Sequence, residues 1–260
     1  MDSKYQKTNQ TTDYNKDLDF GLVLEKSFDN YKKIAGIAGI GMLLSSIVLI
    51  IVGVGIFGSM YGFANFTETL TEFSATITWS TELILLFAGA LFAAVYSPIN
   101  AGFVQMARNA NANENFGLDT LFSFYSSSFF KDLFIAALLI SLFGSVLDFG
   151  FKQMGVFYVG TVITVLASFL TFLSIPLIIF NKMDALTSIT TSIKLVLKNP
   201  LVIFGLLIVA IIVCMLGIFG LCVGLFFTFP FWYSMNYIIY SEMVPEKKLD
   251  VLDEIGIVQE

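Results

Sequence analysis

The chain has 260 residues, of which 57% are apolar and only 13% are charged, and its formal net charge is −6. It contains no His, which excludes His-ligated zinc and iron centres and intramembrane proteolysis by a Ser–His pair. Its long apolar runs exclude a soluble domain of this length, because a helix needs about 20 apolar residues to cross a hydrocarbon core of roughly 30 Å. The composition therefore predicts an all-α, polytopic membrane helix bundle.

In chain order, the apolar runs separate two polar tails from a membrane domain. Residues 1–16 are expected to form a disordered cytoplasmic tail, residues 17–243 the membrane domain, and residues 244–260 an acidic cytoplasmic tail. The last apolar run, residues 201–240, would reach about 60 Å as one helix, twice the core thickness, so it must fold back at its glycines. Six transmembrane helices are predicted, with approximate bounds 34–60, 83–107, 133–150, 156–180, 201–219 and 222–241.

The basic residues indicate how these six helices are oriented. Thirteen of the fourteen Lys and Arg residues fall before the first span, after the last span, or in the second and fourth connections, and only Lys152 falls in the third. The first connection contains Glu68 and Glu72 but no base. Because basic segments stay on the cytoplasmic side, both termini are predicted to be cytoplasmic. We expect a multi-pass protein of a bacterial cytoplasmic (inner) membrane.

A threefold internal repeat is the second prediction about architecture. Amphipathic segments with Lys at 18–33, 118–132 and 184–199 each precede a hairpin of two spans. We expect three pseudo-repeated hairpins, each preceded by an interfacial helix on the cytoplasmic side. The alternative is that these segments are ordinary loops. Asp119 and Asp184 stand near two segment starts as candidate N-caps.

Each even-numbered span contains a proline, which removes one backbone hydrogen bond and frees the carbonyl four residues earlier. Such helix kinks either ring a cavity or only shape the bundle. The prolines are Pro98, Pro176 and Pro230, and the carbonyls are those of Ala94, Phe172 and Phe226.

Polar side chains in the spans are the remaining candidate site residues. Thr161, Thr164, Ser168 and Thr171 fall on one face of the fourth predicted helix. Together with these, three residues near the prolines either line a polar cavity or hydrogen-bond between packed helices. These three are Asn100, Trp232 and Asn236.

Groups that perform chemistry are missing from the apolar runs. No ionisable residue is clearly buried in mid-membrane, and the sequence has no phosphate-binding loop or dinucleotide fingerprint. We expect no enzymatic activity, no cofactor, no metal and no nucleic-acid partner. The leading hypothesis is a scaffold or accessory subunit of a cytoplasmic-membrane assembly, in contact with lipids and with another membrane protein or a second copy. The alternative is a carrier or binder of a lipid or an uncharged small solute.

Two segments also carry a resemblance to a known family. They are SIKLVLKNPLVIFGLL (192–207) and GLFFTFPFWYSMNYIIY (224–240), with a fainter match in SPINAGFVQMAR (97–108). The chain resembles the YciC-like bacterial inner-membrane proteins of unknown function over most of residues 18–243. It is also similar to the membrane domain fused to some glycerophosphodiester phosphodiesterases. The resemblance implies six spans and cytoplasmic termini, and it implies no catalytic residue. Only 17 residues follow Met243, so we expect no phosphodiesterase domain.

Overall fold

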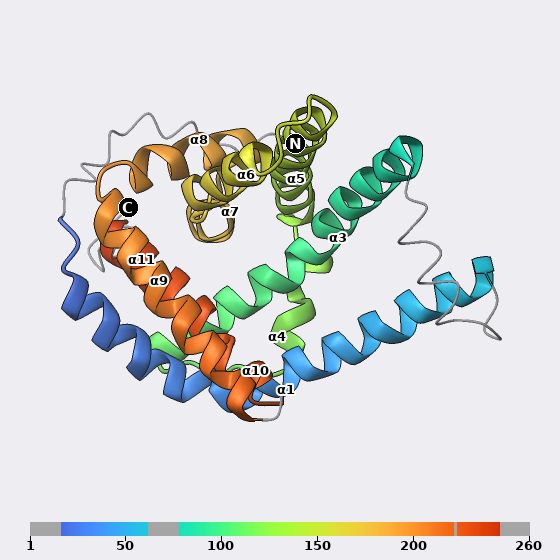
Figure 1. The fold of residues 1–260 in the computed structure, drawn as a ribbon. Coiled ribbons are helices and arrows are strands. Elements are labelled where there is room, and N and C mark those ends of the chain that lie inside the picture. The colour runs from blue at the N-terminus through green and yellow to red at the C-terminus, as the bar shows by residue number, and fades with distance from the viewer. Residues whose placement is uncertain (1–16, 62–77, 221–222, 245–260) are drawn as a thin grey trace, which may run out of the picture.

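The computed structural model describes residues 17–61, 78–220 and 223–244, and all regular structure in these ranges is helical (Figure 1). In chain order the helices are α1 (Phe20–Tyr61), α3 (Trp79–Asn111), α4 (Asp119–Phe122), η1 (Ser123–Tyr125), α5 (Phe130–Gln153), α6 (Val159–Leu170), α7 (Ser174–Asn181), α8 (Ala185–Val196), α9 (Pro200–Leu216), η2 (Gly217–Gly220), α10 (Val223–Thr228) and α11 (Pro230–Met243). The predicted tail 1–16, residues 245–260 of the other tail, and Glu68 and Glu72 lie outside the described residues.

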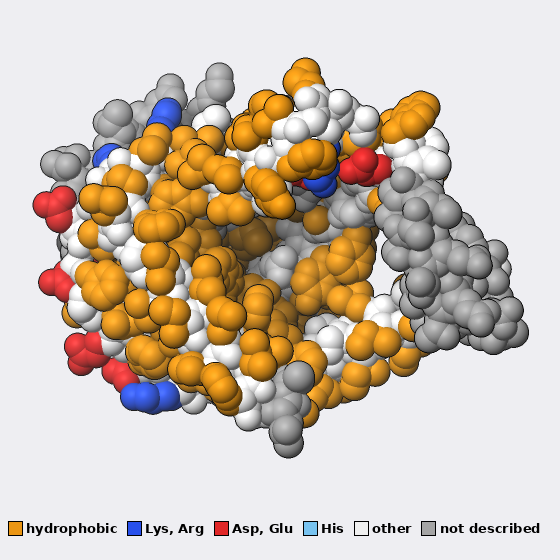
Figure 2. All heavy atoms as spheres, viewed as in Figure 1, with side chains coloured by type: hydrophobic (Ala, Val, Ile, Leu, Met, Phe, Trp, Pro, Cys, Tyr) orange, Lys and Arg blue, Asp and Glu red, His pale blue; other side chains and the backbone are white. Residues whose placement is uncertain are grey.

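Five segments are long and apolar enough to cross a membrane, which agrees with a helical membrane protein. They are Phe20–Gly55, Trp79–Asn111, Phe130–Gln153, Val159–Asn181 and Pro200–Gly220. The predicted sixth span, 222–241, is divided at Phe229 into α10 and α11, and neither piece reaches the length of a span. Figure 2 shows apolar side chains over most of one face, with charged side chains at its margins.

The first helix runs without a break through the predicted boundary between an amphipathic segment and a span. The prediction of a separate helix at 18–33 is wrong, because these residues are part of α1, which contains 42 residues and reaches about 63 Å. Val23, Ser27, Asn30 and Ile34 form one buried stripe that crosses the boundary. Since the same face packs on both sides of the boundary, nothing favours a turn there.

The prediction of a second amphipathic helix at 118–132 is also wrong. Only the short α4 and η1 form, followed by a turn before α5. The Ser123 hydroxyl donates to Thr120 O at 2.8 Å, and the Ser127 hydroxyl donates to Phe124 O at 3.0 Å. These local bonds compete with helix continuation. The predicted N-cap role of Asp119 is not seen, because α4 has no side-chain cap.

The third amphipathic segment does form a helix, α8, and its predicted cap is confirmed. Asp184 Oδ1 accepts a hydrogen bond from Thr187 N at 3.0 Å. The chain also reverses at the predicted glycines after α9. A side chain on Gly217 would collide with Leu225 N and Gly224 C, at 2.7 and 2.8 Å, so the two arms of this turn meet backbone to backbone. Gly217 is the position where the turn depends on the missing Cβ.

The core lies at one end of the bundle and is organised by α11. Every residue from Pro230 to Tyr240 except Trp232 is buried, and α11 packs against α1, α3 and α9. Lys26 Nζ lies 2.5 Å from Glu242 Oε1, so α11 ends beside the beginning of α1. We call this the base-rich end, because α1 begins there with Lys26, α3 ends there with Arg108 and α5 starts there with Lys131.

Candidate functional site

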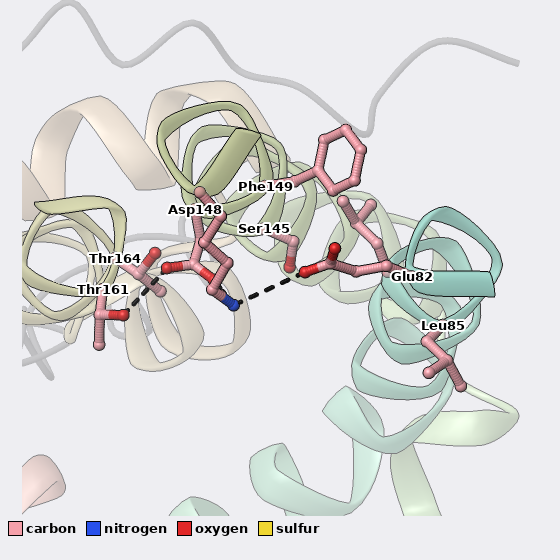
Figure 3. Close-up of a pocket in the computed structure, with 9 residues that line it drawn as sticks. Glu82, Leu85, Ser145, Asp148, Phe149, Thr161 and Thr164 are labelled. Carbon is pink, nitrogen blue, oxygen red and sulfur yellow. Dashed lines mark hydrogen bonds and ion pairs between the residues drawn. The ribbon is translucent and has the colours of Figure 1, made fainter. Parts of the chain in front are cut away.

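The predicted polar stripe of α6 does not line one path. At the end opposite the base-rich end, Thr161 Oγ1 donates to Asp148 Oδ1 at 2.9 Å. Lys152 Nζ lies 2.5 Å from Asp148 Oδ2 and 3.8 Å from Glu82 Oε1. These side chains border a pocket of about 380 Å³ between α3, α5 and α6 (Figure 3). Lys152 joins α5 to Glu82 of α3, and Thr161 joins α6 to Asp148 of α5, so the polar side chains of this pocket connect three helices.

Thr164 lies deeper on the same stripe and serves helix packing. Its Oγ1 is 3.0 Å from Gly144 O on α5 and 2.9 Å from Gly160 O on α6. Gly144 and Gly160 let the two helices approach closely, as small residues do in membrane helix pairs. Ser168 is exposed, and Thr171 donates to Ala167 O of its own helix at 2.8 Å.

A break between α6 and α7 precedes Pro176. Asn236 Nδ2 of α11 donates to Phe172 O at 2.8 Å, and this carbonyl is the one that Pro176 was predicted to free. Ser192 of α8 donates through Oγ to Leu170 O at 2.8 Å and accepts from Leu173 N at 3.0 Å. The broken backbone is therefore satisfied by side chains of two other helices, as a membrane interior requires.

Donors also reach the backbone near the other two prolines. Tyr125 Oη donates to Val95 O at 2.8 Å, and Tyr31 Oη donates to Phe227 O at 3.1 Å. The acceptors are three residues before Pro98 and Pro230, one position later than the predicted carbonyls. All three prolines therefore have a cross-helix donor nearby, which favours the interpretation that they shape the bundle.

The remaining predicted polar residues lie in contacts between helices. Tyr233 Oη donates to Asn100 Oδ1 at 2.7 Å and joins α11 to α3. The ring of Trp232 meets Phe172 edge-on, with centroids 5.4 Å apart. Asn236 holds the α6–α7 break as described above. None of these contacts forms one continuous cavity with Thr161 and Thr164, because those two residues lie at the opposite end of the bundle.

An apolar groove between α5, α6 and α8 was not predicted from the sequence. Its volume is about 570 Å³, and ten of its eleven lining residues are apolar, the exception being Thr171. The walls include Leu139 and Phe143 of α5, Leu166 and Leu170 of α6, and Ile189 and Ile193 of α8. The one sequence signal was the helical spacing of the apolar residues in α8, which indicated an amphipathic helix without showing what its apolar face borders.

Helix α8 presents three different faces. Ser188, Ser192 and Leu195 are buried against the bundle, while Ile189 and Ile193 border the groove. Thr187, Thr190 and Lys194 are exposed on the remaining face. An apolar face beside a polar face is typical of a helix that lies at a membrane interface. Hydrogen bonds from Thr187 hold the pKa of the Asp184 carboxyl below its ordinary value, so the α8 cap is charged at neutral pH.

No protein family, curated protein or solved structure matches the chain. Within the described ranges, no group of three or more Cys, Asp or Glu side chains is placed to hold a metal ion. The groove and the polar pocket are therefore interpreted from their own geometry.

Proposed function

We propose that this chain is a non-enzymatic, multi-pass membrane protein that binds a membrane lipid in the groove between α5, α6 and α8. The groove is the observation that carries the proposal. Its volume of about 570 Å³ lies in the range of small-molecule pockets, roughly 300–1,000 Å³, and its walls offer one hydroxyl and no charge. A hydrocarbon chain matches these walls better than a polar solute does. The predicted solute path along α6 is not supported, because Thr161 and Thr164 bond to α5.

The proposed topology has six crossings arranged as three hairpins, with α10 and α11 together as the last crossing. The Lys26–Glu242 pair supports an even number of crossings, because it brings α11 back to the start of α1. The positive-inside rule places the base-rich end in the cytoplasm of a bacterial cell, with the protein in its inner membrane. Membership of the YciC-like group belongs to the same proposal and rests on the segments quoted above.

Cysteine labelling tests this orientation. We expect a cysteine in place of Met154 to react with an impermeant maleimide added to intact cells, and one in place of Thr190 not to react. Both positions are exposed, Met154 at the α5–α6 turn and Thr190 on α8. The background lacks Cys214 and Cys222, and permeabilised cells show that Thr190→Cys can react. If Thr190→Cys were labelled in intact cells and Met154→Cys were not, the orientation would be the opposite of the one proposed.

Filling the groove tests lipid binding. We expect Leu166→Trp to lower the amount of lipid retained by the purified protein at least severalfold, because the larger ring occupies the groove. Native mass spectrometry in a mild detergent measures the retained lipid. Ile211→Trp is the matched control, because Ile211 is similarly exposed, at 49% against 53%, but lies on α9 outside the groove. Equal retention in the two variants, or no lipid on the wild-type protein, would contradict the proposal.

An accessory subunit is the second candidate function. It is favoured by the half of α1 farthest from the base-rich end, where the six consecutive residues from Ile50 to Gly55 are all exposed. Six residues cover every direction around a helix, so this part of α1 contacts little of its own chain. The same mass spectra separate the two functions. A membrane protein, or a second copy, retained at fixed stoichiometry in place of lipid would favour the subunit.

A further inference from the structure

Among the described residues, three exposed lysines differ from the bases near them in having neither an ion pair nor a side-chain hydrogen bond. Lys26 pairs with Glu242, Lys32 pairs with Asp29 and Arg108 pairs with Glu114. No ion pair or hydrogen bond of the side chain is found for three other bases in the part of the chain that the structure describes. They are Lys131, Lys182 and Lys194.

Lys131 and Lys194 lie on α5 and α8, which border the apolar groove, and Lys182 follows α7 just before α8. Lys194 directly follows Ile193, a wall residue of α8, and lies on the neighbouring exposed face of that helix. Lys182 is the C-cap of α7 and precedes Leu186, another wall residue, by four positions. Lys131 lies in the first turn of α5, eight residues before Leu139, or about 12 Å along the helix. Each lysine therefore lies within eight residues of a side chain that lines the groove.

In the part of the chain that the structure describes, the two carboxylates nearest in sequence form no ion pair with these lysines. Asp184 lies between Lys182 and α8 and caps α8, since Oδ1 accepts from Thr187 N at 3.0 Å and Oδ2 from Thr187 Oγ1 at 2.6 Å. Asp132 follows Lys131 and is only 7% exposed, whereas Lys131 is exposed. The three ammonium groups remain available to an external anion.

We infer that the groove selects an anionic phospholipid, with one acyl chain between α5 and α6 and the phosphate of the head group at Lys131, Lys182 and Lys194. This inference rests on the proposed function, since it names the lipid class of the same site. Each lysine near a membrane surface strengthens binding of an anionic lipid about fivefold. A zwitterionic lipid with the same chains enters the groove but gains little from the lysines.

Binding of two lipids with identical acyl chains tests the inference. The full-length protein is delipidated in a mild detergent and titrated with phosphatidylglycerol or phosphatidylcholine, and native mass spectrometry measures both affinities. We expect the wild-type protein to prefer phosphatidylglycerol at least tenfold. Lys194→Gln lowers this ratio about fivefold, and the triple variant Lys131→Gln, Lys182→Gln, Lys194→Gln brings it close to one. Affinity for phosphatidylcholine stays unchanged.

Lys32→Gln is the matched control, since it removes one charge at the same end but away from the groove, and it leaves the ratio unchanged. Where the triple variant does not fold, Lys194→Gln and the salt dependence of the wild-type ratio decide, because screening by salt weakens only the charged contact. A ratio near one in the wild-type protein, or one that the lysine variants do not lower, overturns the inference while the groove proposal stands. If the wild-type protein binds neither lipid, the proposal that the groove binds a lipid is contradicted.

Discussion

Gly160→Ala is expected to lower the free energy of unfolding by about 2–3 kcal/mol, because it overpacks the α5–α6 hairpin. The new Cβ would stand 2.9 Å from Asp148 N and closer still to Asp148 Cα. Both neighbours are backbone atoms of α5, so no side-chain rotation relieves the contact and the two helices must separate. For a protein of this size the apparent melting temperature in detergent should fall by about 5–10 °C.

Gly150→Ala is the control for this change. Gly150 also lies on α5, and a Cβ there meets no atom within 4 Å. We expect its melting temperature to equal that of the wild-type protein or to exceed it slightly, since alanine favours a helix over glycine. Similar losses in both variants would show that the close approach of α5 and α6 at Gly160 is not a source of stability.

Ser192→Ala is expected to cost about 3 kcal/mol, which is large for the loss of one hydroxyl. The hydroxyl makes two bonds at the α6–α7 break, to Leu170 O and from Leu173 N. Its removal leaves a partly buried acceptor, Leu170 O, and a buried donor, Leu173 N, without this partner, and each such group costs about 1–3 kcal/mol. Thermal unfolding in the same detergent measures the loss.

Ser188→Ala provides a closely matched control on the same helix. Both serines are 0% exposed, but Ser188 Oγ donates only to Ala185 O within α8, at 2.8 Å. The Ala185 carbonyl also lies in a helix that supplies its own partners, so we expect a loss below about 1 kcal/mol. If the two variants lose the same free energy of unfolding, the cross-helix bonds of Ser192 add no more stability than the local bond of Ser188.

The same two serines show how far the sequence predicts packing. Their spacing of four residues places both on one face of α8, and the structure buries both. Nothing local distinguishes them, because the partners of Ser192 lie about 20 residues earlier in the chain. The groove was missed for the same reason, since its walls come from three helices and each wall looks like an ordinary lipid-facing surface.

Some helix boundaries also follow from the local sequence, whereas others depend on contacts between helices. The end of α9 follows from its glycines, and the start of α8 follows from Asp184, because turns and caps depend on adjacent residues. The continuity of α1 accompanies a buried face that includes Asn30, whose Nδ2 donates to Ala107 O of α3 at 2.7 Å and whose Oδ1 accepts from Ser234 Oγ of α11 at 2.8 Å. Local sequence patterns do not contain those partners.

The amino-acid sequence by itself determined the all-helical class, the apolar segments of membrane length and the places where a proline removes a backbone hydrogen bond. Each of these depends on composition or spacing within one segment. The tertiary structure alone decided which side chains satisfy the backbone near those prolines, which atoms the polar stripe of α6 bonds to, and which of the described lysines form no ion pair or side-chain hydrogen bond. These features depend on contacts between segments far apart in the chain. Packing in the fold creates such contacts, and a one-dimensional pattern does not specify them.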